Sequence, residues 1–257
     1  MHPFDRARGT DTGGLIPAAE LATGHANDKH VTAYYGVAPS ILRTLIGLWL
    51  DQTRPAAEID RYTFVDIGAG KGRALLVAAE SPFREVVGIE LNPDLAAVAE
   101  RNLAMVRSAR EADRGGSKTG RAAPLHASHP NEEAASLPDL LAPIKLLTGD
   151  ALSLPLPGTP TLLHLFHPFE GPALRRLLRN VERDFSTRPG TLDLLYVNAE
   201  HAALLDAHPA FTWLWAGAVV MSTEDHLADL QEISTQMEYG STGDEQCAIY
   251  RYTGRSR

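Results

Sequence analysis

Residues 62–73 read Tyr-Thr-Phe-Val-Asp-Ile-Gly-Ala-Gly-Lys-Gly-Arg, and this stretch indicates the fold. An apolar run of strand length ends in three glycines at alternate positions, Gly68, Gly70 and Gly72. Glycine carries no Cβ atom, so these positions allow a tight turn and the close approach of a ligand. Residues 73–80 follow with helical character, and the free N–H groups of a helix start favour negative ligand groups. We therefore expect a strand, a glycine turn and a helix around a binding site.

The rest of the chain alternates strands with helices. Strands are predicted at 85–90, 144–147, 161–166 and 192–197, helices at 39–50, 93–106, 174–185 and 200–207, and β-rich stretches at 211–222 and 246–252. Such alternation is typical of an α/β fold with a mostly parallel sheet covered on both faces. Ligands of these sheets bind at the carboxyl ends of the strands, so the residues that follow each strand are candidates for the site.

Two acidic residues follow the next predicted strands. Glu90 ends the strand at 85–90, and Asp150 comes shortly after the strand at 144–147. An acid at the end of the second strand can bind both ribose hydroxyls of a nucleoside. The structural alternatives are an exposed carboxylate at Glu90 and a turn-forming aspartate at Asp150.

The dinucleotide fingerprint Gly-x-Gly-x-x-Gly does not fit, because Arg73 occupies the position of its third glycine. Residues 66–72 (Asp-Ile-Gly-Ala-Gly-Lys-Gly) instead resemble motif I of class I S-adenosylmethionine-dependent methyltransferases. This resemblance implies a Rossmann-like, doubly wound, mostly parallel seven-stranded sheet with helices on both faces. It also implies S-adenosylmethionine as the cofactor, S-adenosylhomocysteine as its product, and no metal.

The same resemblance implies a role for each matching residue. Gly68, Gly70 and Gly72 would hold the methionine part of the cofactor, Asp66 would lie near its ammonium, Glu90 would bind the ribose hydroxyls, and Asp150 and Ala151 would contact the adenine. The charges agree with this assignment. The cofactor is a hydroxyl-rich cation, and acidic residues suit it better than they suit a pyrophosphate.

Residues 165–170 (Leu-Phe-His-Pro-Phe-Glu) end the fourth predicted strand and resemble motif IV of the same family. That motif, Asn/Asp-Pro-Pro-Tyr/Phe, is common in enzymes that methylate nitrogen, so we predict His167, Pro168 and Phe169 as catalytic. His167 departs from the motif, because Asn or Asp usually stands there. A neutral imidazole accepts one hydrogen bond and can also act as a base. The structural alternative is a histidine that only ends the strand.

The start of the chain resembles the opening of a group of largely uncharacterised bacterial methyltransferases. Residues 4–14 read Phe-Asp-Arg-Ala-Arg-Gly-Thr-Asp-Thr-Gly-Gly, and such segments close over the cofactor or the substrate. Tyr34 and Tyr35 are the aromatic candidates for this lid, or else packed loop residues. We predict an N-terminal helical arm over residues 1–60 and a methyltransferase domain over residues 61–257, with a flexible insertion at about 107–143.

Composition excludes several classes of protein. The 257 residues contain 24 Lys and Arg against 32 Asp and Glu, for a net charge of −8, which argues against a nucleic-acid partner. No apolar run is long enough for a membrane span, and the N-terminus lacks a secretory signal, so a cytoplasmic protein is expected. The one cysteine, Cys247, excludes an intrachain disulfide.

The predicted function is the transfer of a methyl group from S-adenosylmethionine to a small molecule, with a nitrogen atom as the nucleophile. Three alternatives remain open: a protein lysine N-methyltransferase, a nicotinamide oxidoreductase, and a non-catalytic nucleoside-binding module. The first is open because residues 66–73 also resemble histone lysine methyltransferases of the class I fold.

Overall fold

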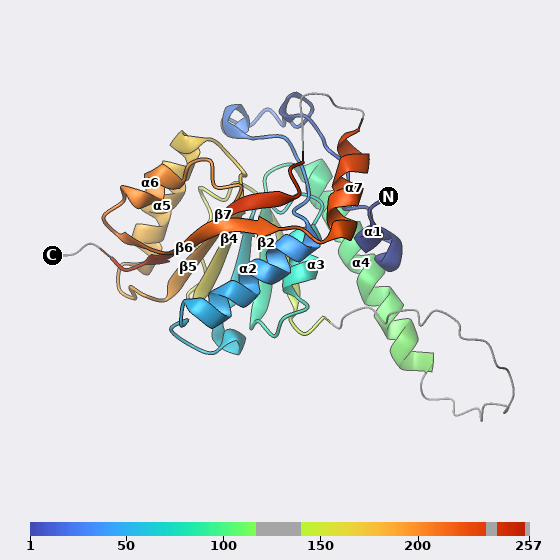
Figure 1. The fold of residues 1–257 in the computed structure, drawn as a ribbon, viewed down its shortest axis with the longest axis horizontal. Helices are drawn as coiled ribbons and strands as arrows, with labels where there is room; N and C mark the ends of the chain where they lie inside the picture. The colour runs from blue at the N-terminus through green and yellow to red at the C-terminus, as the bar shows by residue number, and fades with distance from the viewer. Residues whose placement is uncertain (117–139, 235–240, 255–257) are drawn as a thin grey trace, which may run out of the picture.

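Seven strands form one sheet in the computed structural model, which describes residues 1–116, 140–234 and 241–254 (Figure 1). The strands are β1 (Thr63–Ile67), β2 (Glu85–Glu90), β3 (Ile144–Thr148), β4 (Thr161–Phe166), β5 (Leu192–Val197), β6 (Phe211–Val220) and β7 (Asp244–Tyr252). Their order is β3-β2-β1-β4-β5-β7-β6; β1 to β5 pair in parallel, and β7 is antiparallel to both of its neighbours. The prediction of a mostly parallel sheet is confirmed, with β6 and β7 as an antiparallel pair.

Helices cover both faces of this sheet. They are α1 (Pro3–Arg8), α2 (Pro39–Gln52), α3 (Arg73–Ala78), α4 (Pro93–Gly116), α5 (Gly171–Phe185), α6 (Ala202–Asp206) and α7 (Thr223–Ile233). One apolar core joins α2, α3 and α4 to strand residues such as Phe64 and Leu162, and a second joins α5 and α6 to Val65 and Leu163. Successive strand residues point to opposite faces of the sheet. Because helices cover both faces, β1 is buried at every position.

Helix α2 is part of the first core. Its apolar residues recur at helical spacing, and the Trp49 side chain at its end is fully buried. Trp49 Nε1 donates to Asp193 Oδ2 at 2.7 Å, and Arg251 Nε donates to Asp193 Oδ1 at 2.7 Å. Within the predicted arm of residues 1–60, α2 is therefore fastened to the sheet.

Two helices differ from the sequence prediction. Helix α4 continues to Gly116 instead of ending near Val106, because residues 107–116 are mostly strong helix formers, although they lack an apolar stripe. The remaining part of the predicted insertion, residues 117–139, lies outside the described residues. Helix α7 was not predicted, although the Ser222 hydroxyl caps its start by accepting from Asp225 N at 3.1 Å.

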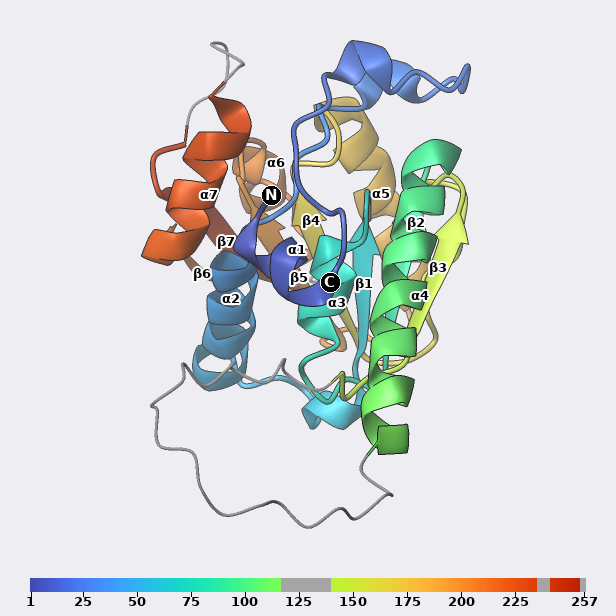
Figure 2. The ribbon, with the colours of Figure 1, turned by 90° about the vertical axis from the view of Figure 1, so that its right-hand side faces the viewer.

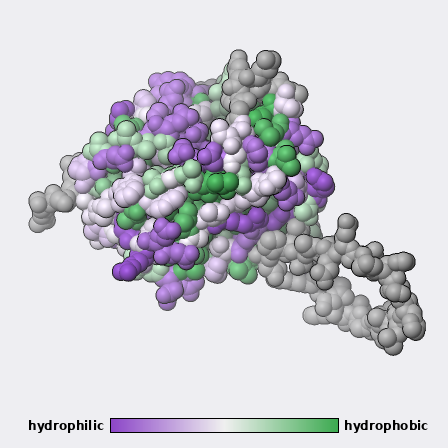
Figure 3. Space-filling view, in the orientation of Figure 1, coloured by the Kyte–Doolittle hydropathy of each residue, from purple (hydrophilic) through white to green (hydrophobic). Residues whose placement is uncertain are grey.

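The surface is mixed in character. On the face in Figure 3, hydrophilic residues are widespread and the hydrophobic residues coloured there form only small separate groups. Among the described helices, none combines the length and apolar character needed to cross a bilayer.

Candidate active site

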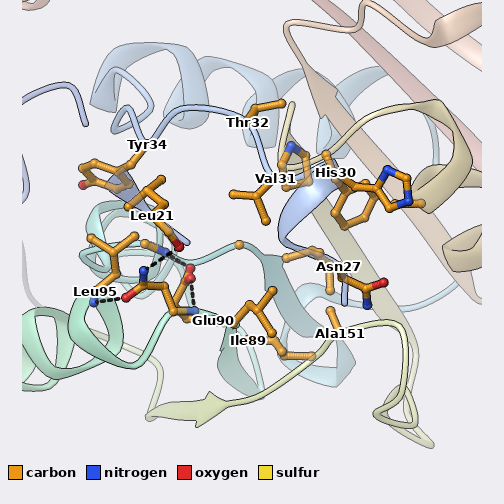
Figure 4. A pocket seen from close by; sticks show the side chains of 18 of the residues that line it. Leu21, Asn27, His30, Val31, Thr32, Tyr34, Ile89, Glu90, Leu95 and Ala151 are labelled. Carbon is orange, nitrogen blue, oxygen red and sulfur yellow. Dashed lines mark hydrogen bonds between the residues drawn. The ribbon is translucent and has the colours of Figure 1, made fainter. Parts of the chain in front are cut away.

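Two adjoining cavities lie at the carboxyl ends of the strands. The first is enclosed by the ends of β1, β2, β3 and β4 on one side and by residues 21–35 on the other (Figure 4). In Figure 2 the N-terminal segment, in blue, runs above the strands. The second cavity lies beside the first, and both are lined by Thr32, Ala33, Tyr35 and Phe166. The first is the smaller, about 110 Å³ against about 530 Å³, and residues 21–35 lie across it.

The glycine turn shapes the floor of the first cavity. Gly68, Gly70 and Gly72 all have positive φ angles, 77°, 53° and 89°, which side chains rarely adopt. A Cβ atom at Gly68 would lie 3.0 Å from Pro168 Cβ, and one at Gly70 would overlap the Tyr34 ring. Gly70 therefore requires glycine for both backbone conformation and space, whereas Gly68 and Gly72 favour it for backbone conformation.

Glu90 is buried beside this turn, with only 6% of the residue exposed. Its Oε2 accepts from Gly70 N at 2.7 Å, and its Oε1 accepts from Asn92 N at 2.8 Å (Figure 4). Burial raises the pKa of Glu90, and the two N–H donors oppose that rise by stabilising the carboxylate. Glu90 lines the first cavity, and each oxygen keeps a lone pair for a further donor. The alternative of an exposed carboxylate does not hold.

Asp150 and Ala151 follow β3 and also line the first cavity. Asp150 Oδ1 accepts from Leu152 N at 2.9 Å, so the residue forms a turn as well. Its Oδ2 accepts from Asn27 Nδ2 at 3.0 Å, which connects the turn to the segment lying across the cavity. Asp150 thus lies in the cavity, as predicted, and also stabilises a turn, which was the structural alternative.

Asp66 is placed differently. It does not appear among the described residues that line either cavity. Its Oδ1 lies 2.7 Å from His164 Nδ1, and both side chains are buried inside the sheet where β1 pairs with β4. The role near a ligand ammonium remains a prediction, and the contact that the structure shows is this carboxylate–imidazole pair.

Residues 167–169 are divided between the two cavities. Pro168 and Phe169 line the first cavity, whereas His167 lines the second. His167 has a φ of 40°, and its carbonyl accepts from Thr32 Oγ1 at 2.6 Å. The turn after β4 thus sends neighbouring side chains to both cavities, which sequence alone did not predict.

The His167 imidazole has one nitrogen near a carboxylate and one without a partner among the described residues. Its Nε2 lies 3.4 Å from Glu200 Oε2, and its buried Nδ1 has no hydrogen-bond partner among the described residues. Burial lowers the pKa of His167; Glu200 opposes this, and the neighbouring His201 adds to it. A neutral ring with its proton toward Glu200 would leave the Nδ1 lone pair free.

Arg73 holds the start of the chain in place. Its guanidinium is buried and donates to Thr12 Oγ1 at 2.8 Å, to Gly36 O at 3.2 Å and to Asp5 Oδ2 at 3.4 Å. Asp5 Oδ1 also accepts from Thr10 Oγ1 at 2.7 Å and from Thr12 N at 2.9 Å. The conspicuous residues at 4–14 therefore supply structural contacts that position the segment after them.

The segment across the first cavity has further attachments. The Tyr34 hydroxyl donates to Thr12 O at 2.7 Å while its ring packs on Gly70. Asn27 Oδ1 accepts from Arg176 Nη1 at 2.8 Å, which ties the segment to α5. Sequence reasoning selected Tyr34 and Tyr35 but missed Asn27 and Thr32. Single polar residues in a segment without periodicity carry no signal that separates them from ordinary loop residues.

Comparisons with known proteins find solved structures of low similarity to this chain. No protein-family model and no curated protein sequence matches the chain. Among solved structures, the O-methyltransferase TomG from Streptomyces achromogenes, in complex with S-adenosylmethionine, is 15% identical over 91% of this chain and 83% of that chain, with a TM-score of 0.46. An RNA methyltransferase from Salinibacter ruber, in complex with S-adenosylhomocysteine, is 17% identical over 86% of this chain and 95% of that chain, with a TM-score of 0.41. A Thermoplasma acidophilum protein is 11% identical over 98% and 95%, with a TM-score of 0.46.

The function therefore has to be inferred from the cavities themselves. The sheet, mostly parallel and covered on both faces, agrees with what the resemblance of residues 66–72 implies. The glycine turn and Glu90 meet at the predicted edge of that sheet. The chain thus has the fold expected of a class I S-adenosylmethionine-dependent methyltransferase.

Proposed function

We propose that this protein is a methyltransferase that uses S-adenosylmethionine and acts on a small molecule. The observation that carries the proposal is the buried Glu90 carboxylate, which lines a cavity next to a turn of glycines with positive φ angles. Asp150 adds a second acid, and no Lys or Arg stands among the described residues that line this cavity. Glu90 and Asp150 would repel a pyrophosphate, so these acids favour a cationic nucleoside over a dinucleotide.

The donor set fits the cofactor. Glu90 would accept hydrogen bonds from the ribose hydroxyls, and the methionine part would lie against the glycine turn, close to the backbone. Asp150 and Ala151 would contact the adenine, which the apolar side chains of Ile89 and Leu152 would also cover.

When bound, S-adenosylmethionine supplies a methyl group on a positively charged sulfur. The protein then has to align the acceptor and exclude water, since effective alignment alone can contribute about 7–11 kcal/mol. Pro168 and Phe169 line the first cavity, and Phe166 lines both. His167 would hold the acceptor from the second cavity, with nitrogen as the nucleophile that the motif IV resemblance predicts. Residues 21–35 would keep solvent away.

Calorimetric titration with S-adenosylmethionine, S-adenosylhomocysteine and NAD tests this function. We expect the two adenosyl compounds to bind and NAD to bind far more weakly. Glu90→Ala removes charge-assisted hydrogen bonds, so it should lower the affinity for S-adenosylhomocysteine by about tenfold or more. Glu100→Ala, which removes an exposed acid on α4, is the matched control and should leave the affinity unchanged. A preference for NAD, or equal affinities for Glu90→Ala and wild type, would refute the function.

A second experiment tests His167. Alanine there removes the side-chain acceptor and should lower turnover much more than cofactor affinity. His167→Asn keeps an acceptor, and Asn tolerates the positive φ of this position, so it should retain more turnover than His167→Ala. Equal turnover in all three proteins would show that His167 is only structural.

A further inference from the structure

The second cavity is strongly acidic. Four carboxylate residues line it, Glu200, Asp229, Asp244 and Glu245, and its described lining contains no Lys or Arg. Among the described residues that line it, the only basic one is His167, whose pKa is lowered by burial. Its volume of about 530 Å³ lies in the range of small-molecule sites. A cavity of this charge disfavours anions and favours a cation.

Asp229 is the most informative of these acids. It projects from α7, only 1% of the residue is exposed, and its Oδ1 has no hydrogen-bond partner among the described residues. Burial raises the pKa of Asp229 to about 6. The Tyr35 hydroxyl partly offsets this rise in pKa, and a bound donor at the unpartnered Oδ1 would stabilise the carboxylate further.

Glu245 also lines this cavity and likewise lacks a nearby positive charge among the described lining residues. It lies on β7, and burial together with the nearby Asp229 and Asp244 raises its pKa to about 7. Like charges around a cavity raise one another's pKa values, and perturbed values of this kind concentrate at functional sites. A cation between Asp229 and Glu245 would stabilise both carboxylates.

The remaining walls suit the carbon stem of such a cation. Tyr35 and Phe166 stand at the boundary with the first cavity, and Ile233 adds an aliphatic surface. Aromatic rings attract alkylammonium groups as well as covering their carbon chains. No three described His, Cys, Asp or Glu side chains are grouped as metal ligands would be, so the acids surround a larger cation better than a bare metal ion.

We propose that the second cavity binds the methyl acceptor, and that this acceptor is a small molecule carrying primary aliphatic ammonium groups. The inference rests on the proposed function, because it takes the first cavity as the cofactor site. Asp229 and Glu245 would hold one cationic group, while a second amine reaches the shared wall beside His167 and Phe166.

The reaction balances with the groups present. The reacting ammonium first gives a proton to the neutral His167 imidazole, which passes it to solvent. The nitrogen lone pair then bonds the methyl carbon, while the C–S bond breaks and its electron pair stays on sulfur. The products are a methylated ammonium, the thioether S-adenosylhomocysteine and one released proton.

The test titrates full-length protein, saturated with S-adenosylhomocysteine, with linear alkyl diamines and with diols of the same length. We expect the diamines to bind and the neutral diols to bind at least about tenfold more weakly. Asp229→Asn and Glu245→Gln should each weaken diamine binding by about tenfold and leave S-adenosylhomocysteine affinity unchanged. Glu224→Gln, an exposed acid on the same helix α7, controls for net charge and should change neither affinity.

Each other outcome is decisive. Equal binding of diols and diamines, or variants that bind diamines as wild type does, would overturn the acceptor assignment. Binding of a lysine-containing peptide but not of free diamines would assign the same ammonium chemistry to a protein substrate and overturn the small-molecule source. If wild-type protein binds S-adenosylhomocysteine but not diamines, this inference alone is refuted. If wild-type protein does not bind S-adenosylhomocysteine, the proposed function is refuted.

Discussion

Replacing Arg73 by methionine would remove the charge at the centre of the contacts that hold the N-terminal segment. Methionine keeps most of the apolar stem, so the change isolates the guanidinium. That group makes three hydrogen bonds to Asp5, Thr12 and Gly36, and only 2% of Arg73 is exposed. Without it, the Asp5 carboxylate, itself 2% exposed, stays buried without its cation. Breaking a buried pair from one side costs about 3–5 kcal/mol, so we expect a loss of that size in the free energy of unfolding.

Urea unfolding of wild type, Arg73→Met, Asp5→Asn and the double variant would measure this loss and its coupling. The double variant should lose less than the sum of the single variants, because neither charge is then left alone. Hydrogen exchange over residues 9–36 should accelerate in Arg73→Met, since this segment loses its attachment. Arg84→Met, at an exposed position, should change stability by less than about 0.5 kcal/mol. A loss below about 1 kcal/mol in Arg73→Met, with unchanged exchange, would refute this reasoning.

Three further predictions follow from the site and its surroundings. Gly70→Ala places a Cβ on the Tyr34 ring at a φ of 53°, so it should lower stability by about 1–3 kcal/mol and weaken S-adenosylhomocysteine binding; thermal melting and calorimetry check both effects, and a neutral result would contradict the close packing. Burial raises the pKa of Cys247 to about 12, so its thiol should react with a disulfide reagent only after unfolding; rapid labelling of native protein would exclude the buried position. The pKa of Asp229 is raised above its ordinary value of 3.8 to about 6, so this group makes the folded state less stable as pH rises between those values; urea titrations should show Asp229→Asn gaining stability relative to wild type across that window, and a constant difference would contradict the burial.

Much of the fold could be predicted because its signals are local. Apolar runs of strand length alternate with amphipathic segments, and the glycine turn after β1 fixes where a ligand approaches. The end of α4 was harder to predict, since residues 107–116 are helical by intrinsic propensity and do not follow an apolar period. Helix α7 was missed despite the Ser222 cap, and its apolar residues do not mark its buried face: Leu227 and Leu230 are exposed, whereas Asp225 and Asp229 are buried.

The site was predicted only where its residues follow strands. Glu90 and Asp150 could be placed because the carboxyl ends of parallel strands meet at one edge. Asp229 and Glu245 lie on α7 and β7, and only the pairing of the tail with β5 brings them into the cavity that His167 lines. The role of Arg73 in anchoring Asp5 depends on a contact between residues far apart in sequence, and local patterns do not encode such contacts.

A crystal structure of the protein with S-adenosylhomocysteine would test the central claim most directly. We expect the ribose hydroxyls within hydrogen-bonding distance of the Glu90 carboxylate, the adenine beside Asp150 and Ala151, and the sulfur directed toward the wall that the two cavities share. A nucleoside bound elsewhere, or one whose ribose leaves Glu90 bonded only to Gly70 and Asn92, would contradict the assignment of the first cavity as the cofactor site.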